Sequence, residues 1–514
     1  MLVGDILQRN ARRYPDKIAL VVKDVRLTWG QVNRRVNALV SSLYKLGFCK
    51  GNRLAVLSMN CHQCLELFFT YAKSGIIGVP LNYRITGREL EYIINNVGAQ
   101  GIVVSNEYAD TFRSIAARCP SVKWVIGIGD GHNFDLDYEE LIHQGVPEEP
   151  KVPLSEDDVY VIFYTSGTTG FPKGAMITHK NRIANIINQQ IAEKGEPWDI
   201  NLTLTPLYHI GAEWVAMGYM YLGCTNIVMD KFEILEFMKT VEKERVTICL
   251  FMATMLLFVI NHPDFGKYDL SSLRLIIYGG GPMPEAVLRE SMRKIGCNFI
   301  GGYGQTETSP LATIMPIADH ILDSPDKILR LPSIGREATN TWVKIVDDND
   351  NELPLGEIGE IIVKGDNVMK GYWNNPEETA QTLRGGWCHT GDMGSKGKDG
   401  YFYIHDRKKD MIISGGENIY SKEVEDVLYS HPKVMDTAII GIPDETWTEA
   451  VCAHIVLKKG ETATEEEIIE FCKAHLASYK KPRKVVFVDE LPRSPGGKIL
   501  KKLFREQYWK DKCK

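Results

Sequence analysis

Apolar and polar positions along roughly the first 400 residues follow two different spacings. Positions 34–46 and 65–74 carry apolar residues at helical spacing, whereas short continuous apolar runs stand at 54–57 and 76–80. Short runs of this kind, bounded by turn residues, predict buried strands. Strands that alternate with helices favour parallel sheets with helices on their faces. The pattern therefore predicts an α/β fold.

Two later regions depart from this alternation. Residues 342–363 contain short strand-like runs broken by polar turns, which predicts β-rich hairpins. A boundary is expected near 406–410, and beyond it a separate α+β unit has strand and helix patterns at 438–440, 453–457, 465–477 and 485–488. We therefore predict a large domain over 1–408, with two parallel-sheet α/β subdomains and a β-rich subdomain, and a small mobile α+β domain over 409–514.

Composition narrows the class of protein. The chain has 514 residues, of which 44% are hydrophobic and 25% charged, as in an ordinary globular enzyme. A net charge of -6 makes a nucleic-acid partner a poor expectation. The most apolar run, 248–260, is too short to span a membrane, and no secretory signal is recognised. Eleven cysteines without a paired framework suit a reducing compartment, so we expect a cytoplasmic protein.

One cysteine pair stands close together in the sequence. Cys61 and Cys64 form a lone C-x-x-C, with no second pair at zinc spacing. The pair follows Asn60, a residue type that caps helices, and precedes an apolar helical pattern. We interpret the pair as a helix start in preference to a metal or redox site. In the small domain, Ser421 is expected to cap a helix in the same way.

The first strong chemical signal is a loop rich in glycine and hydroxyl residues at 164–174, directly after an apolar run. Phosphate oxygens need several converging N–H and O–H donors, and glycines let the backbone approach closely. The loop offers such donors and one positive charge, from Thr165, Ser166, Gly167, Thr168, Thr169 and Lys173. It is not a P-loop, because Pro172 precedes the lysine and Gly174 follows it. It predicts binding of a phosphate-bearing ligand at a strand's carboxyl end.

This loop resembles that of the adenylate-forming superfamily, which includes acyl-CoA synthetases, firefly luciferases and peptide-synthetase adenylation domains. Further motifs follow in that superfamily's order, at 178–181, 279–284, 302–307, 386–392, 406–407, 412–419 and 495–498. The resemblance is greatest to the acid:CoA ligases. It implies that an acid reacts with ATP to give an acyl-adenylate and pyrophosphate, and that coenzyme A then takes the acyl group and releases AMP. It also implies Mg2+ as a cofactor and allows a homodimer.

By this resemblance, most of the ATP and AMP contacts come from residues of five motifs. They are Gly279, Gly280, Gly281, Tyr303, Gly304, Thr306, Asp392, Arg407 and Lys498. The Tyr303 ring can stack on adenine, and Asp392 can accept hydrogen bonds from both ribose hydroxyls. Thr306 and Glu307 offer oxygens to Mg2+, which takes one or two carboxylates and keeps phosphate and water ligands.

The expected catalytic residues are Lys498, Glu307, Thr306 and His209. By resemblance, Lys498 bridges the substrate carboxylate and the α-phosphate. Positive charge is needed there because the first step brings one anion onto another. The substrate carboxylate itself attacks phosphorus, so no protein nucleophile is required.

The small domain is implied to serve the second step. By resemblance, Lys409 is a hinge, and the residues that bind CoA are Gly415, Gly416, Trp447, Tyr479, Lys481 and Arg483. The basic stretch at 480–484 is equally compatible with a solvated surface. Thr448 stands where the superfamily usually has glycine, which weakens the assignment of the CoA nucleotide site.

The acyl pocket is expected among His209, Gly211, Trp214, Gly281 and Gly302. The two glycines at 281 and 302 leave room for an alkyl or aryl group, and Trp214 can close the far end. Ala253 replaces a usual proline, which shifts the expected pocket wall. Glu213 is an unusual residue so near this pocket. Three alternatives stay open: its side chain faces solvent, pairs with a basic residue, or faces a cationic acyl group.

Three other functions stay open at this point. An enzyme that loads a carrier protein would keep the same nucleotide motifs, but an amino-acid-selecting domain usually carries an aspartate where Tyr208 and His209 stand. A luciferase-like oxidase is excluded only weakly. A binding-only protein would be expected to lose Lys498 or Glu307, and both are present.

Overall fold

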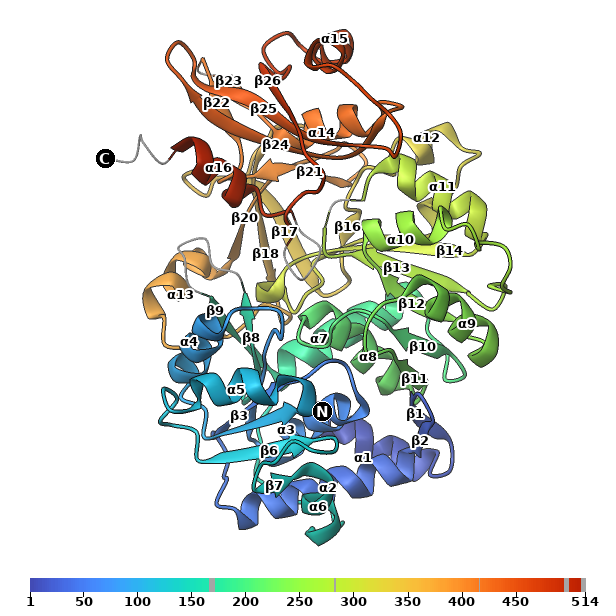
Figure 1. Ribbon diagram of the computed structural model, residues 1–514, viewed down its shortest axis with the longest axis vertical. Helices are drawn as coiled ribbons and strands as arrows, with labels where there is room; N and C mark the ends of the chain where they lie inside the picture. The colour runs from blue at the N-terminus through green and yellow to red at the C-terminus, as the bar shows by residue number, and fades with distance from the viewer. Residues whose placement is uncertain (166–171, 282, 416, 494–498, 510–514) are drawn as a thin grey trace.

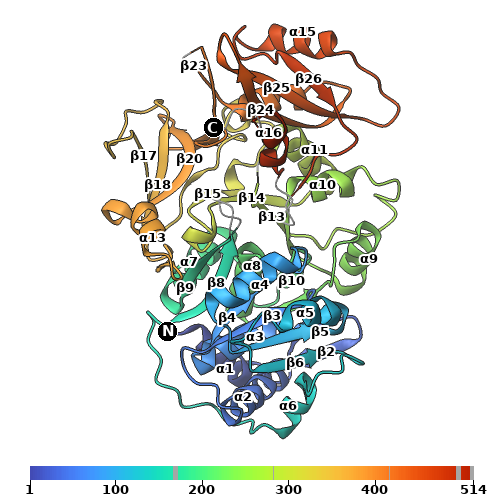
Figure 2. The ribbon, with the colours of Figure 1, turned by 60° about the vertical axis from the view of Figure 1, so that its left-hand side comes forward.

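The computed structural model describes residues 1–165, 172–281, 283–415, 417–493 and 499–509. Two large sheets occupy the lower part of Figure 1, and the unit drawn in orange and red, which contains the last strands and helices, lies above them. A third sheet, β17 to β21, lies between these parts and to one side, as Figure 2 shows. Parallel sheets, a β-rich subdomain and a C-terminal domain are therefore all present, and the predicted mixed α/β class is confirmed.

The first large sheet has the strand order β19-β9-β8-β4-β3-β5-β6-β7 within the described residues. Its parallel strands are β3 (Arg53–Leu57), β4 (Ile77–Pro80), β5 (Gly101–Ser105), β6 (Trp124–Ile128), β7 (Leu136–Asp137) and β8 (Val159–Thr165). Antiparallel β9 (Lys173–Thr178) and β19 (Gly371–Tyr372) complete one edge. The intervening helices are α2 (Trp29–Lys45), α3 (His62–Ser74), α4 (Gly87–Val97), α5 (Ala109–Ala116) and α6 (Tyr138–Gln144), as the βαβ pattern predicts.

The second large sheet has the order β16-β15-β14-β13-β12-β10-β11-β1-β2. Its strands are β1 (Ile18–Val22), β2 (Val25–Thr28), β10 (Ile200–Thr203), β11 (Thr225–Val228), β12 (Ile248–Phe251), β13 (Leu275–Gly279), β14 (Asn298–Tyr303), β15 (Thr313–Met315) and β16 (Arg336–Glu337). The associated helices are α1 (Val3–Arg13), α7 (His179–Glu193), α8 (Ile210–Leu222), α9 (Ile234–Glu244), α10 (Ala253–Ile260), α11 (Glu285–Ile295) and α12 (Pro325–Ile328). The apolar run at 248–260 is β12 followed by α10, so it is divided between a strand and a helix.

The β-rich sheet is antiparallel, with the order β17-β18-β20-β21. Its strands are β17 (Thr341–Val346), β18 (Gly359–Gly365), β20 (Cys388–Lys396) and β21 (Phe402–Arg407), and α13 (Pro376–Thr382) precedes β20. The polar turns at 347–351 and 354–356 separate β17 from β18, which confirms the predicted hairpin.

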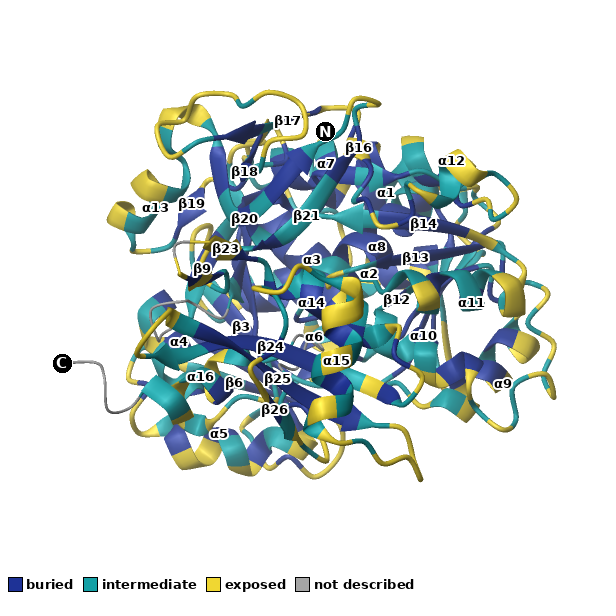
Figure 3. Cartoon of the chain, turned by 90° about the horizontal axis from the view of Figure 1, so that it is seen from above, coloured by how far each residue is buried: buried dark blue, intermediate teal, exposed yellow. Residues whose placement is uncertain are grey.

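The C-terminal unit has its own five-stranded sheet within the described residues. Its elements are β22 (Ile412–Ser414), β23 (Glu417–Ile419), α14 (Ser421–Tyr429), β24 (Val434–Asp444), β25 (Thr448–Leu457), α15 (Glu465–His475), β26 (Lys484–Phe487) and α16 (Lys501–Trp509). Figure 3 colours β24 and β25 largely as buried and much of α15 as exposed, and α15 packs on these strands through Ile468 and Cys472. The break between this sheet and the β-rich sheet falls between β21 and β22. The domain boundary at 408/409 stays a prediction.

Two predicted helix caps are wrong by one position. α3 begins at His62 with Cys61 as its N-cap, because the Asn60 side chain is used elsewhere: it donates to the carbonyls of Thr205 and Met229. α14 begins at Ser421 itself. Within the described chain, no helix combines the length and the apolar character needed to cross a membrane.

Candidate active site

Strands β13 and β14 lie side by side, and several glycines stand at or just beyond their carboxyl ends. Their parallel register pairs Gly279 with Gly302 at the carboxyl ends, where α/β sheets bind ligands. Gly280 has φ +77°, and a Cβ placed on Gly280 or Gly281 would have no atom within 4 Å. The edge is therefore open, and a flat ligand can approach the backbone closely.

Gly304 turns the chain away from this edge and can only be glycine. Its φ is +158°, and a Cβ there would lie 1.8 Å from the carbonyl oxygen of Pro310. The turn aims its neighbours at the β-rich sheet. Tyr303 Oη donates to Asp392 Oδ2 at 2.9 Å, and Gln305 Nε2 donates to the carbonyl of Thr390 at 3.2 Å. Two separate sequence motifs thus meet in space.

Asp392 is held between a phenol and a guanidinium. The antiparallel register of β20 and β21 sets Arg407 directly opposite Asp392, and Arg407 Nε lies 3.2 Å from Asp392 Oδ1. Burial raises the pKa of Tyr303 well above its usual value, and the Asp392 charge adds to that shift. Burial opposes the charge on Arg407, but the carboxylate of Asp392 raises its pKa overall. The side chains of Tyr303, Asp392 and Arg407 therefore form one fixed polar cluster.

Glu307 lies on the short 3-10 helix Thr306–Thr308, which follows β14 closely. Its side chain is buried, and Tyr372 Oη donates to its Oε1 at 2.6 Å. Burial and the Glu307 charge together raise the pKa of Tyr372. The Glu307 carboxylate and the hydroxyl of the preceding residue, Thr306, are oxygen donors of the kind that Mg2+ takes when phosphate and water supply its other ligands. No larger cluster of His, Cys, Asp and Glu able to hold a metal occurs among the residues that the structure describes.

The hydroxyl-rich loop connects β8 to β9. Thr165 pairs with Lys173 at the loop end of this hairpin, and Thr165 Oγ1 donates to the Lys173 carbonyl at 3.4 Å. Lys173 forms an ion pair with Glu378, and its ammonium lies 5.6 Å from the centre of the Tyr372 ring. Tyr372 therefore links the end of this loop to Glu307. The other predicted loop residues, Ser166, Gly167, Thr168 and Thr169, lie outside the described residues.

Three of the predicted acyl-pocket residues, His209, Gly211 and Trp214, lie at the start of α8. His209 is the helix N-cap, and its ring centre is 4.5 Å from that of Tyr208. Gly211 has open space, since its nearest neighbour for a Cβ is Leu250 at 4.0 Å. Trp214 is buried in a cluster that includes Ile300. Side chains alternate along a strand, so Ile300 and Gly302 share a face of the sheet, and Trp214 packs on that face.

Glu213 does not face the acyl pocket as a free charge. It is fully buried and forms an ion pair with Arg182, which is also fully buried. Tyr160 Oη donates to Glu213 at 2.6 Å, and Arg182 Nη1 donates to the carbonyl of Ser309 at 2.7 Å. The pairing with a base is therefore the correct alternative, and the cationic acyl group is ruled out as its partner. Sequence reasoning missed Arg182, although an acid inside the apolar helix α8 signals a buried cation.

The residues predicted to bind CoA lie on the C-terminal unit. Gly415 has φ +61°, and a Cβ there would lie 2.7 Å from the Trp447 ring. The Arg483 guanidinium lies 5.2 Å from the centre of the same ring. Tyr479 is exposed and Lys481 is partly exposed, and Gly416 lies outside the described residues. Thr448 has φ +71°, which a β-branched residue rarely adopts.

Fewer contacts are described for Lys409, the predicted hinge, than for the nucleotide cluster, and none for Lys498, the predicted adenylation lysine. Lys409 is exposed in the connection between β21 and β22, and its carbonyl accepts a hydrogen bond from Arg505 at 2.5 Å. Lys498 lies outside the described residues, between Arg493 and Ile499, which form an isolated bridge.

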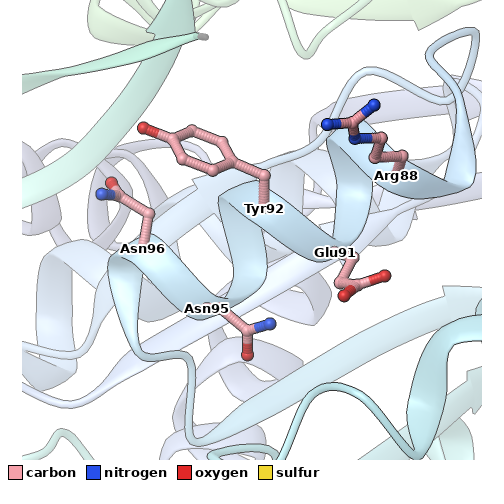
Figure 4. A pocket seen from close by; sticks show the side chains of 5 residues that line it. All are labelled: Arg88, Glu91, Tyr92, Asn95 and Asn96. Carbon is pink, nitrogen blue, oxygen red and sulfur yellow. The ribbon is translucent and has the colours of Figure 1, made fainter.

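A hollow of about 410 Å³ lies on the surface of α4 (Figure 4). It is lined by Arg88, Glu91, Tyr92, Asn95 and Asn96. Asn96 accepts a hydrogen bond from Tyr164 at 2.6 Å, so the hollow adjoins the β8 side of the loop hairpin. None of the residues that line this hollow belongs to the cluster of Tyr303, Asp392 and Arg407. We assign the nucleotide chemistry to the cluster and not to the hollow.

Three comparisons place this geometry among known proteins. Feruloyl-CoA synthase of Amycolatopsis sp is 36% identical over 501 residues, which cover 97% of this chain and 98% of that protein. Fatty acid--[acyl-carrier-protein] ligase ScoC of Streptomyces coeruleorubidus is 33% identical over 515 residues, covering 98% and 96%. The crystal structure of the anthranilate CoA ligase AuaEII with anthranoyl-AMP matches with a TM-score of 0.90 at 27% identity, covering 99% of this chain and 97% of that one.

Family models agree with these matches. The model described as AMP-binding enzyme matches residues 7–373, and the model described as AMP-binding enzyme C-terminal domain matches residues 423–498. The resemblance drawn from the motifs is confirmed. This chain, with its clustered Tyr303, Asp392 and Arg407 beside an open glycine edge, belongs to the AMP-binding enzyme family.

Proposed function

We propose that the protein is an AMP-forming acid:CoA ligase that uses the side chains described above in two successive half-reactions. The observation that carries the proposal is the cluster of Tyr303, Asp392 and Arg407 beside the bare edge at Gly279–Gly281. The ring of Tyr303, next to open backbone, suits adenine. The fixed carboxylate of Asp392 suits the ribose hydroxyls, and the cation of Arg407 suits phosphate.

In the first half-reaction, the acid's carboxylate attacks the α-phosphorus of ATP and expels pyrophosphate. Asp392 and Arg407 hold the ribose and phosphate, and Thr165 and Lys173 bracket the loop that receives the departing phosphates. Lys498, assigned by its motif, neutralises the negative charge that builds between the two anions. Thr306 and Glu307 would hold Mg2+, which supplies further positive charge at the phosphates.

In the second half-reaction, the CoA thiol attacks the acyl carbonyl and AMP leaves. We propose that the C-terminal unit rotates at Lys409 between the half-reactions, so that Gly415 and Gly416 flank the pantetheine arm. Gly415 supports this assignment because it lies against the ring of Trp447, another predicted CoA-binding residue. Arg483 beside that ring offers a cation to a nucleotide phosphate.

The acyl group binds, in this proposal, between Trp214 and the sheet face that contains Gly302, with His209 near its carboxylate.

The ten described cysteines are all free thiols, which supports a reducing, cytoplasmic location.

The decisive experiment measures AMP release by the purified protein. We expect release only when an acid, ATP, Mg2+ and CoA are present together, and a panel containing ferulate, anthranilate and fatty acids of several lengths identifies the acid class. Acid-dependent exchange of pyrophosphate into ATP without CoA isolates the first half-reaction. Absence of exchange with every acid would contradict the proposal.

The similarity to ScoC favours one alternative acceptor, a carrier protein. The same assay separates the two acceptors. Acyl transfer to a phosphopantetheinyl carrier protein, with free CoA inert, would support the alternative. Acyl-CoA formation from free CoA supports the ligase.

A further inference from the structure

The C-x-x-C at the start of α3 places two thiols in contact. Cys61 is the N-cap of this 13-residue helix, and its Sγ lies 3.5 Å from the Sγ of Cys64. Cys64 is buried, whereas Cys61 is partly exposed. The two sulfurs need to approach only to the roughly 2.05 Å of a disulfide bond. Side-chain rotation together with a small shift of the backbone at Cys61 can supply a movement of this size, so the geometry favours closure of the pair.

The surroundings give the two thiols different chemistry. Ser58 Oγ lies 3.6 Å from Cys61 Sγ, and Cys64 Sγ donates to the carbonyl of Met59 at 3.5 Å. The contact with Cys64 lowers the pKa of Cys61, with help from Ser58 and against the effect of burial. The pKa of Cys64 is raised by its contact with Cys61 and by burial. The thiol that ionises more easily thus belongs to the less buried residue of the pair.

Asn60, which precedes Cys61, is hydrogen-bonded to the loop at 205–209. This loop ends at His209, a predicted acyl-pocket residue. Asn60 Nδ2 donates to the carbonyls of Thr205 and Met229 at 3.0 and 3.1 Å. Its Oδ1 accepts from the backbone N–H of Leu207 at 2.8 Å, two residues before His209. Because Asn60 is buried and makes all three bonds, a change of backbone at Cys61 is transmitted to this loop.

We propose that Cys61 and Cys64 form a reversible redox pair, and that its oxidation displaces the 205–209 loop through Asn60. A low-molecular-weight disulfide is the oxidant. The Cys61 thiolate attacks one of its sulfurs and releases the other half as a thiolate, leaving a mixed disulfide on Cys61. Cys64 then loses its proton to solvent and attacks the Cys61 sulfur, which expels the second half. The protein pair is oxidised, and the small disulfide is reduced to two thiols.

The test of the site does not require enzymatic activity. The reduced full-length protein is equilibrated with glutathione mixtures of rising oxidised fraction, quenched in acid, alkylated with maleimide and mapped by mass. We expect Cys61 and Cys64 to lose maleimide reactivity together and to recover with dithiothreitol. Exposed Cys49 serves as the control and should carry glutathione at most. A Cys61–Cys64 peptide that keeps both maleimides, or carries two glutathiones, overturns the proposal.

Single variants test the order of attack. Cys64→Ser should stop at a glutathione adduct on Cys61, and Cys61→Ser should leave buried Cys64 unmodified. Cys49→Ser should behave like the unmutated protein. Equal glutathione adducts on both single variants would contradict the assigned roles.

The coupling to the loop is tested by exchange of pyrophosphate into ATP, a readout that rests on the proposed function. We expect the KM for the acid to change by about threefold or more on oxidation, because small displacements near a substrate carry large rate effects. The change should be absent in Cys61→Ser. An unchanged KM in oxidised protein would overturn the coupling. Absence of pyrophosphate exchange in the reduced protein would instead count against the proposed function. The mass map would still show whether Cys61 and Cys64 form a disulfide.

Discussion

Single residues determine the geometry of the nucleotide cluster. Asp392 is 6% exposed and is oriented by Tyr303 and Arg407, so its carboxylate cannot rotate freely. Gly304 permits the turn that brings Tyr303 to it, since any side chain there would collide with the Pro310 carbonyl. The cluster is therefore preorganised, which reduces the entropic cost of binding a nucleotide.

Asp392→Asn tests the role of this carboxylate. The variant keeps the shape but loses the charge, and hydrogen bonds to charged groups contribute about 1.5–3 kcal/mol each. We expect the KM for ATP to rise by roughly 10- to 100-fold in pyrophosphate exchange. Asp350→Asn, in the exposed ion pair with Arg384, is the matched control and should leave the KM unchanged. An equal effect of both substitutions would argue against a nucleotide contact.

The sequence identified these residues but not their contacts. Motif context singled out Tyr303, Asp392 and Arg407, because their types and order suit a nucleotide. Their meeting depends on the β20–β21 register and on the Gly304 turn, which residue types alone do not specify. Likewise, the Asn60 cap was placed one residue early, because local pattern could not show that its side chain binds Thr205.

At the scale of elements, α7 and α8 are joined by buried polar contacts. Arg182 of α7 pairs with Glu213 of α8, and Tyr219 Oη of α8 donates to Glu193 at the end of α7 at 2.6 Å. A buried ion pair need not stabilise a fold relative to apolar packing, but loss of one partner leaves an uncompensated charge. These contacts fix the register of the two helices beneath the site.

Glu213→Ala should therefore destabilise the protein strongly. We expect a loss of about 3–5 kcal/mol in the free energy of unfolding, because Arg182 remains buried without its partner. Urea unfolding measures this loss. Asp110→Ala removes the partner of Arg113 in an exposed pair and should cost within about 0.5 kcal/mol. Losses of similar size in the two variants would contradict the buried-pair account.

Glu193 predicts a specific dependence of stability on pH. Burial raises its pKa from 4.5 to about 8, although hydrogen bonds from Tyr219 and Gln189 oppose the shift. Between these two pKa values the folded state binds more protons than the unfolded state, so this group lowers stability as pH rises. Below about pH 4.5 both states are protonated, and the contribution is constant.

Glu193→Gln removes this titration while it keeps a similar shape. The stability of the variant relative to the unmutated protein should increase between about pH 5 and about pH 8, by an amount on the order of a few kcal/mol. Chemical unfolding of both proteins at several pH values gives the difference, in which other titrating groups largely cancel. A difference that stays constant with pH would mean that Glu193 titrates normally.

At the scale of the whole molecule, the C-terminal unit has its own sheet and meets the remainder chiefly near β21 and α14. Ser421 N donates to Asp406 at 2.5 Å, and Lys422 Nζ donates to the carbonyl of Ile404 at 3.2 Å. These few polar contacts are compatible with rotation about the connection at Lys409. The sequence predicted this division from its change of pattern, and the rotation stays a proposal.

Lys409→Pro tests the rotation, because proline fixes φ at the proposed hinge. Pyrophosphate exchange should survive, whereas acyl-CoA formation from preformed acyl-adenylate should slow by about tenfold or more. Lys409→Ala removes the same side chain but leaves the backbone free, and it should retain both half-reactions. If both also survive in Lys409→Pro, the rotation account is wrong.

The long-range pairing of β1 was not predictable from local pattern. It affects when the second large sheet can form during synthesis of the chain. β1 ends at Val22, and its parallel partner β11 begins at Thr225, about 200 residues later. At translation rates of about 5–20 residues per second, the apolar N-terminal strand waits roughly 10–40 seconds for this partner. During that time it exposes an unpaired edge. The N-terminal strands therefore keep an unpaired edge until β11 has been made, and the second sheet can close only late in synthesis.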